Sequence, residues 1–160
     1  MSVTSMDYKV TGLSAEPFVH LYGLSETELA AQGVTRMIAT EPDSFPDRIE
    51  MRDGEIGESF LLLNHEYQTG DSPYRARHAI FVREGATDQF ECLNAIPDVM
   101  HKRMIALRAF DINHLMVDAE IAQGDAIEIE VQRMLANADV AYIQAHNARR
   151  GCYSGRIERA

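Results

Sequence analysis

A chain of 160 residues, of which 46% are hydrophobic and 25% charged, has the composition of a globular domain and not that of a disordered segment. The formal net charge of −10 disfavours binding to nucleic acid or to an anionic membrane, unless the positive charge is gathered in one place. The start, MSVTSMDYKV, does not resemble a secretion signal, and no stretch approaches the ~18 apolar residues of a spanning helix. We therefore expect a cytoplasmic protein that binds neither nucleic acid nor membrane.

The first clear element is a short helix over residues 26–32. Ser25 can accept a hydrogen bond from a backbone N–H of the first turn, and Glu28 can reach back to the helix start. Gly33 then suits the left-handed conformation that commonly ends a helix.

Two further helices are expected. One begins at Pro97, which suits the first helical position, and runs to Arg103. The other begins after Asp125 as its N-cap and extends toward Asn137. Apolar residues recur in it at the spacing of a single buried stripe, which comprises Ile127, Val131, Met134, Leu135 and Ala138.

Strands dominate the remainder of the chain, separated by turn residues. The predicted strands are residues 8–10, 34–40, 48–52, 59–67, 74–83, 104–110, 115–121, 140–147 and 152–158. This pattern predicts an α+β fold, with a mostly antiparallel sheet packed against two or three helices in a single domain over residues 1–160. The strand at 8–10 suits a sheet edge, and residues 1–12 are expected to fray.

Side-chain alternation assigns faces to the strand at 74–83. Ile80 and Val82 share one face with His78, which is therefore expected to point inward, whereas Arg75 and Arg77 lie on the other face.

The last two strands are joined by residues 148–151, which predicts a hairpin with Gly151 in a positive-φ conformation. Symmetric pairing places His146 opposite Tyr153. His146 and Cys152 then lie on opposite faces and cannot form a nucleophile and base pair, unless a β-bulge changes the register.

Cys152 has Arg149, Arg150 and Arg156 as sequence neighbours, which would favour a thiolate with a catalytic or redox role. The alternative is a small buried apolar side chain, the usual state of a free cysteine. Cys92 lacks such neighbours and is expected only to pack. Two cysteines without CxxC spacing indicate reduced thiols.

None of the six histidines forms a close ligand pair such as HExxH. His65, His78 and His146 could together hold zinc if the tail joined the two neighbouring strands. A structural role for each histidine is the alternative, since a metal site also needs partners that orient its ligands, and we predict no metal site. No Gly-rich phosphate loop is present, so the sequence leaves the cofactor unknown.

Arginine supplies nearly all the positive charge, because only Lys9 and Lys102 are lysines. The segments 73–78 and 147–153 each combine arginine with tyrosine and a neutral hydrogen-bonding side chain, as a carboxylate or phosphate site requires. The alternative is that these arginines balance surface acids. The candidate ligand-binding residues are Arg75, Arg77, Asn147, Arg149, Arg150 and Tyr153, and the candidate catalytic residues are His146, His78 and Cys152.

The runs SPYRARHAIFVREG, MIALRAFD and VAYIQAHNARRGCYSGRIERA resemble a family of small bacterial proteins known as the domain of unknown function numbered twelve-oh-three. The resemblance extends from about Leu13 onward. It implies a single, stand-alone, bacterial and cytoplasmic domain, and it implies no activity, cofactor or catalytic residue.

Three hypotheses remain open. The first is binding of a small anionic metabolite, with or without catalytic turnover, in which Arg75, Arg77 and Arg149 hold the anion and a histidine exchanges protons. The second is a non-catalytic interaction or self-association module, for example a homodimer, anchored by tyrosine and arginine. The third is a protein that works through the thiol of Cys152.

Overall fold

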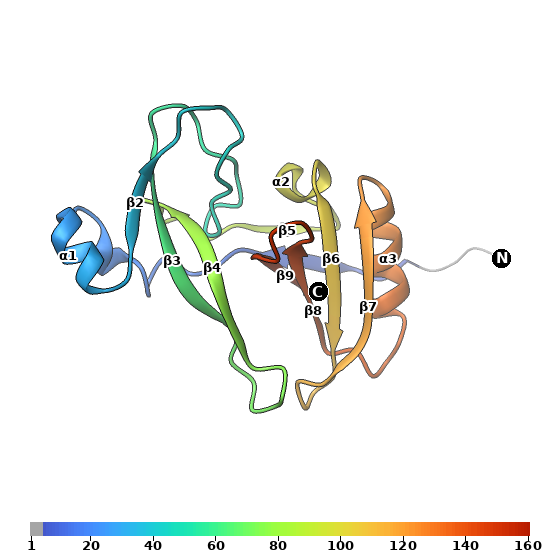
Figure 1. Cartoon of the computed structure of the whole chain (residues 1–160). Helices are drawn as coiled ribbons and strands as arrows, with labels where there is room; N and C mark the ends of the chain where they lie inside the picture. Colours follow the sequence, from blue (N-terminus) through green and yellow to red (C-terminus); the bar gives the residue numbers. More distant parts are fainter. Residues whose placement is uncertain (1–4) are drawn as a thin grey trace.

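The structure is a computed structural model that describes residues 5–160 as two antiparallel sheets flanked by short helices (Figure 1). Six strands form the first sheet, in the order β5 (Glu91–Leu93), β1 (Tyr8–Thr11), β9 (Tyr153–Arg159), β8 (Tyr142–Asn147), β6 (Met104–Phe110) and β7 (Met116–Gln123). Three strands form the second, in the order β2 (Thr35–Ile38), β3 (Ser59–Gln68) and β4 (Ala76–Arg83). The helices are α1 (Glu26–Ala31), α2 (Asp98–His101) and α3 (Ala126–Leu135), with a 3₁₀ turn at Val19–Leu21. The predicted α+β class is confirmed.

Helix α3 covers one face of the first sheet and closes the larger of two hydrophobic cores. The predicted stripe is buried at Ile127, Val131, Met134 and Leu135, but Ala138 lies beyond the helix and is exposed. Asp125 occupies the N-cap without a capping bond, because its carboxylate instead contacts His101 Nε2 at 2.9 Å. The amphipathic period was therefore predictable, whereas the use of the cap residue was not.

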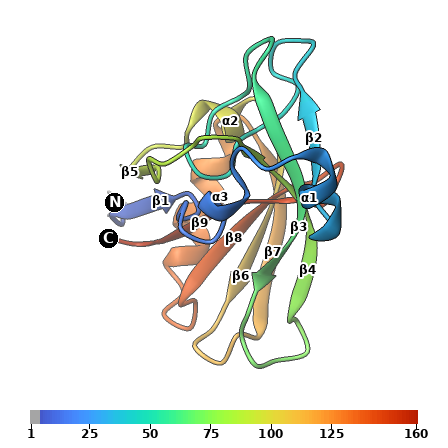
Figure 2. The same ribbon diagram turned by 90° about the vertical axis from the view of Figure 1, so that its left-hand side faces the viewer.

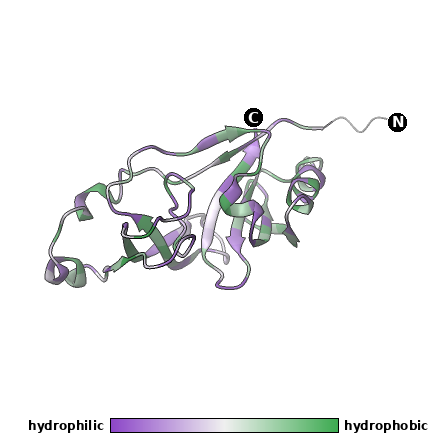
Figure 3. Cartoon of the chain, turned by 90° about the horizontal axis from the view of Figure 1, so that it is seen from above, coloured by the Kyte–Doolittle hydropathy of each residue, from purple (hydrophilic) through white to green (hydrophobic). Residues whose placement is uncertain are grey.

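The second core lies between the three-stranded sheet and the segment around α1. Seen from above, α1 and α3 lie at opposite ends of the elongated molecule (Figure 3). The β8–β9 hairpin stands between them and contributes to both cores, with Ile143 and Ile157 in the first and Tyr153 in the second. Residues near the tip of this hairpin are consequently held from two sides.

Strand β1 was expected at an edge but lies between β5 and β9. Tyr8 is fully buried and pairs with Arg159, so that β1 and the C-terminal end of β9 run side by side (Figure 2). Fraying was expected for residues 1–12. Residues 1–4 lie outside the described residues, whereas Tyr8–Thr11 form β1. Strand β5 was not predicted.

The strand predicted at 48–52 is wrong. Asp47 is buried, and its carboxylate accepts the backbone N–H of Glu50 at 2.7 Å and of Arg83 at 2.8 Å. These bonds fold the segment into a buried loop, in which Met51 adopts a φ of 52°. Side-chain acceptors that satisfy nearby amides compete with strand pairing in this way.

In the described part of the chain, no helix is long and apolar enough to cross a membrane.

Candidate functional site

The tip of the β8–β9 hairpin has the predicted geometry. Asn147 N–H donates to Cys152 O over 2.8 Å, Gly151 N–H donates to Asn147 O over 2.7 Å, and Gly151 has a φ of 78°. His146 lies opposite Tyr153. Side-chain alternation therefore directs the Cys152 sulfur to the face away from the His146 ring.

The pairing then shifts by one residue along β9. Ala145 pairs with Gly155 and Ile143 with Ile157, so Ser154 is the extra residue of a β-bulge. Ile157 consequently packs with Ile143 in the first core, and not on the His146 face as symmetric pairing predicts. The bulge lies beyond Cys152 and does not bring its sulfur toward His146.

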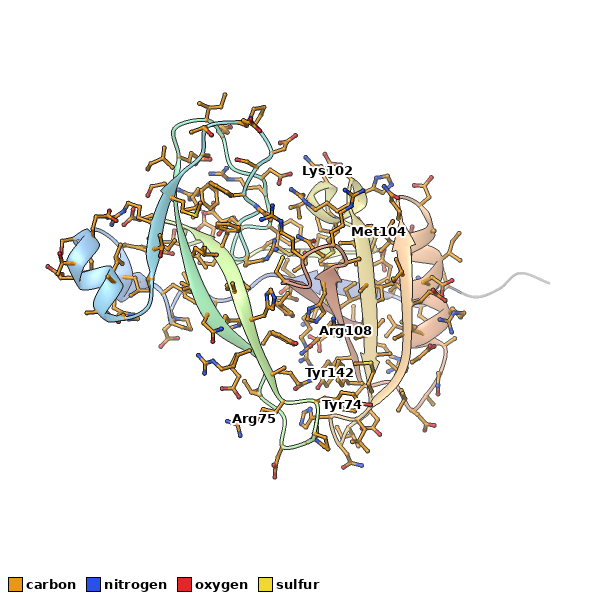
Figure 4. All side chains as sticks on the ribbon, viewed as in Figure 1. Tyr74, Arg75, Lys102, Met104, Arg108 and Tyr142 are labelled. Carbon is orange, nitrogen blue, oxygen red and sulfur yellow. The ribbon has the colours of Figure 1, made fainter. Side chains whose placement is uncertain are left out.

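A cavity of about 370 Å³ opens beside the hairpin tip. Its wall combines a loop before β3, a residue of β4, the start of β6, the end of β7 and the hairpin itself. The lining residues are Asp43, Ser44, Pro46, Phe81, Lys102, Arg103, Met104, Gln123, Asn147, Arg149, Arg150 and Cys152. Figure 4 shows Lys102 and Met104 at this end of the first sheet.

Four cations line the cavity, and they fall into two classes. Lys102 and Arg103 are both paired with Asp53, the lysine at 2.7 Å and the arginine through its Nη2. Arg149 and Arg150 are exposed and have no carboxylate within 4.0 Å in residues 5–160. Their charge therefore faces the cavity and the solvent.

Unpaired arginine is the exception in this structure. Most arginines of the described chain contact a carboxylate, namely Arg36, Arg52, Arg75, Arg77, Arg83, Arg103, Arg133 and Arg156. Arg159 instead donates to backbone carbonyls beyond the end of α3. The remaining arginines are Arg48, Arg108, Arg149 and Arg150, and they lie on or around the β8–β9 hairpin.

Arg48 belongs to this site although it was not predicted. Its side chain is only 1% exposed, and its Nη2 donates to Cys152 Sγ over 3.2 Å. Asn147 Nδ2 approaches the same sulfur at 3.5 Å. Arg48 comes from a segment far away in the chain and was assigned to a strand, so no local sequence signal could have placed it beside Cys152. Lys102 and Arg103 were not identified as site residues either, because no local sequence signal indicates that they line this cavity.

His146 is fully buried behind the hairpin, where its Nδ1 lies 3.2 Å from Gly151 O. The ring packs edge-on against Tyr67 and Tyr153, with centroid distances of 4.8 and 5.7 Å, and Nε2 has no partner in the described chain. Burial, reinforced by the positive charge of Arg108, lowers the pKa of His146 to about 3. The imidazole is therefore neutral at neutral pH.

Tyr153 is likewise buried, within the second core, and its pKa is raised by burial. Neither Tyr153 nor His146 lines the cavity. Of the candidate residues, the structure brings Asn147, Arg149, Arg150 and Cys152 together around one cavity.

Arg75 and Arg77 lie elsewhere. Arg75 Nε contacts Glu66 at 2.6 Å, and Arg77 donates to Asn64 Oδ1 and lies 3.6 Å from Glu66. Figure 4 shows Arg75 at the other end of β4 from Lys102. The two arginine segments of the sequence thus do not form one anion site in this structure.

His78 of β4 lies near the tip of the β8–β9 hairpin, close to Gly151. It lies opposite His65 on the face that carries Ile80, as alternation predicts, but its side chain is exposed and not buried. A Cβ at Gly151 would lie 3.9 Å from His78 Nε2. Residues 5–160 contain no cluster of three or more His, Cys, Asp or Glu side chains arranged to hold a metal ion.

The model of a family described as "Protein of unknown function (DUF1203)" matches residues 44–159. The chain belongs to this family. The DUF1203 match includes every residue that lines the cavity except Asp43, while β1, α1 and β2 precede it. No curated protein and no solved structure matches the chain.

Proposed function

We propose that this DUF1203 protein binds a small anionic molecule in the cavity beside the β8–β9 hairpin. Arg149 and Arg150 supply the positive charge, and Asn147 supplies an adaptable amide on the same wall. Planar guanidinium groups bind carboxylate or phosphate oxygens through paired hydrogen bonds.

The observation that carries the proposal is the distribution of unpaired arginines. In a chain with a net charge of −10, acidic side chains are abundant and pair with most arginines. The arginines that lack a carboxylate are concentrated around one hairpin, and two of them line a cavity whose volume of about 370 Å³ suits a small ligand. An anion from solution would complete this electrostatic arrangement.

We also infer a bacterial and cytoplasmic setting. The resemblance of the sequence to a bacterial family supports the first part. The presence of Cys92 and Cys152 as free cysteines supports the second, because reduced thiols are typical of a reducing compartment.

The binding proposal predicts that anions raise the thermal unfolding midpoint. Phosphate, pyrophosphate and citrate, compared at equal ionic strength, are suitable probes. A ligand at ~100 times its dissociation constant stabilises a protein by about 2.7 kcal/mol, and each kcal/mol raises the midpoint of a domain of this size by roughly 2–4 °C. The shift should be lost in the Arg149→Gln/Arg150→Gln variant.

The matched control is Arg75→Gln/Arg77→Gln, which removes the same charge from the exposed end of β4, where Glu66 is the partner. This control should retain the anion-dependent shift. An equal shift in both double variants, or no shift with any of the three anions in the unmodified protein, would disprove anion binding at the hairpin.

A further inference from the structure

The hydrogen bonds of Cys152 differ from those of an ordinary buried thiol. Its sulfur receives N–H groups from Arg48 Nη2 at 3.2 Å and Asn147 Nδ2 at 3.5 Å, and within the described chain it donates to no acceptor. A neutral thiol is a weak acceptor and has its own S–H to donate. Two N–H donors directed at one sulfur fit a thiolate better than a thiol.

Cys92 provides an internal comparison. Its Sγ donates to Ala95 O over 3.2 Å, as a protonated thiol does. Burial also raises the pKa of Cys92. The two cysteines of this chain therefore differ in their hydrogen bonds: the sulfur of Cys92 donates, whereas the sulfur of Cys152 only accepts within the described chain.

Arg48 supplies the second, independent observation. Its side chain is 1% exposed, its Nε has no partner, and no carboxylate lies within 4.0 Å of it in residues 5–160. The adjacent carboxylate of Asp47 is occupied by the backbone N–H groups of Glu50 and Arg83. A guanidinium stays protonated in proteins, and a buried charge without a counter-ion is strongly unfavourable.

Cys152 is the group that can provide this counter-ion. Burial lowers the pKa of Arg48, and the interaction with Cys152 is the largest influence in the opposite direction. Cys152 also lines the cavity that Arg149 and Arg150 line, so a reagent in the cavity lies beside this residue.

We propose that Cys152 is a nucleophilic thiolate, balanced by buried Arg48, that attacks an electrophilic carbon of an oxyanion-bearing molecule in the cavity. The second half of this statement rests on the proposed anion binding, whereas the first half does not. The sulfur donates an electron pair to form an S–C bond, and the leaving group departs with the electrons of the bond that breaks. No oxidant or reductant is required.

The test is alkylation of the folded protein at neutral pH with iodoacetate and, separately, with iodoacetamide. In both cases an S–C bond forms and iodide leaves, but only iodoacetate carries a negative charge. The rates at Cys152 and Cys92 are followed by mass spectrometry of the corresponding peptides. Cys152 should react at least about tenfold faster than Cys92, although its side chain is the more buried of the two, because the thiolate is the reactive form.

The role of Arg48 is tested by two variants. Arg48→Met should slow alkylation of Cys152 by about tenfold and leave Cys92 unchanged, while Arg48→Lys, which keeps the positive charge, should retain most of the rate. Circular dichroism checks the fold. If Arg48→Met does not fold, the ratio of the two cysteine rates in the unmodified protein still decides, because a Cys152 that reacts no faster than Cys92 overturns the proposal.

The claim that the electrophile carries an oxyanion is tested by comparing the rates of the two reagents. The ratio of the iodoacetate rate to the iodoacetamide rate should be higher at Cys152 than at Cys92, and this excess should disappear in Arg149→Gln/Arg150→Gln. A fast Cys152 without any excess would support the thiolate and overturn the claim that its electrophile is a bound oxyanion-bearing molecule. The two proposals therefore fail in distinguishable ways.

Discussion

At the scale of single residues, Arg48 and His146 are two buried basic groups that meet the cost of burial in different ways. Arg48 must remain charged in a buried position, whereas His146 escapes the same cost by remaining neutral. Burial opposes protonation of His146 most strongly, followed by the positive charge of Arg108; the carbonyl of Gly151 favours protonation, and Arg48 and His78 add smaller opposing effects. Its buried neutral state therefore links stability to pH.

The pKa of His146 in the folded state, about 3, lies below the value near 6.5 in the unfolded chain. The unfolded state consequently binds a proton first, so the stabilisation is fully present above pH 6.5 and is lost as the pH falls from 6.5 toward 3. The slope is about 1.4 kcal/mol per pH unit within this window. Urea unfolding at pH 7 and pH 5 should show a loss about 2 kcal/mol larger in the unmodified protein than in His146→Phe. An equal loss in both proteins would contradict this account.

At the scale of elements, the caps of α1 and α3 allow a direct comparison. Ser25 Oγ accepts the N–H of Glu28 at 3.1 Å, as predicted, whereas Asp125 at the start of α3 makes no capping bond. Ser25→Ala should therefore lower the free energy of unfolding by about 1 kcal/mol. Asp125→Ala, measured in the same urea titration, should have a clearly smaller effect. The reverse order would show that capping does not determine the stability of these helix starts.

The β8–β9 hairpin shows which parts of an element can be predicted. The short connection and Gly151 specify the turn and the pairing next to it, because both are local properties of the chain. The bulge around Ser154 is not local. A Cβ at Gly155 would lie 2.9 Å from the ends of Met51 and Met100, so the path of β9 is set by contacts with distant segments. Side-chain alternation therefore predicted the faces correctly only as far as the bulge.

At the scale of the whole molecule, the same limit applies to the candidate site. Arg149, Arg150 and Cys152 were found because they are neighbours in the sequence. Arg48 approaches the sulfur only through the tertiary fold, and Arg75 and Arg77 are removed from the site by their pairing with Glu66. Sequence composition identifies arginine as the relevant cation, but which arginines lack a carboxylate depends on which strands and loops the fold places side by side.

Tyr142 connects those two sheets and provides a test of their coupling. Its hydroxyl accepts Gln68 Nε2 of β3 at 3.0 Å and lies 2.7 Å from His114 Nδ1 in the β6–β7 turn, while its ring stacks on Phe110. Tyr142→Phe keeps the ring but leaves the buried Gln68 amide without its acceptor and the half-buried His114 ring without its partner, which should cost about 1–3 kcal/mol.

Calorimetry measures this cost as a lower unfolding midpoint, by roughly 2–4 °C per kcal/mol, within a single transition if the sheets unfold together. Tyr74→Phe is the matched control, because Tyr74 is 41% exposed and its hydroxyl makes no hydrogen bond within residues 5–160. It should change stability by less than about 0.5 kcal/mol. Equal midpoints for the two variants would show that the Tyr142 hydroxyl does not hold the sheets together. A second transition in Tyr142→Phe would show instead that the sheets unfold separately once this link is removed.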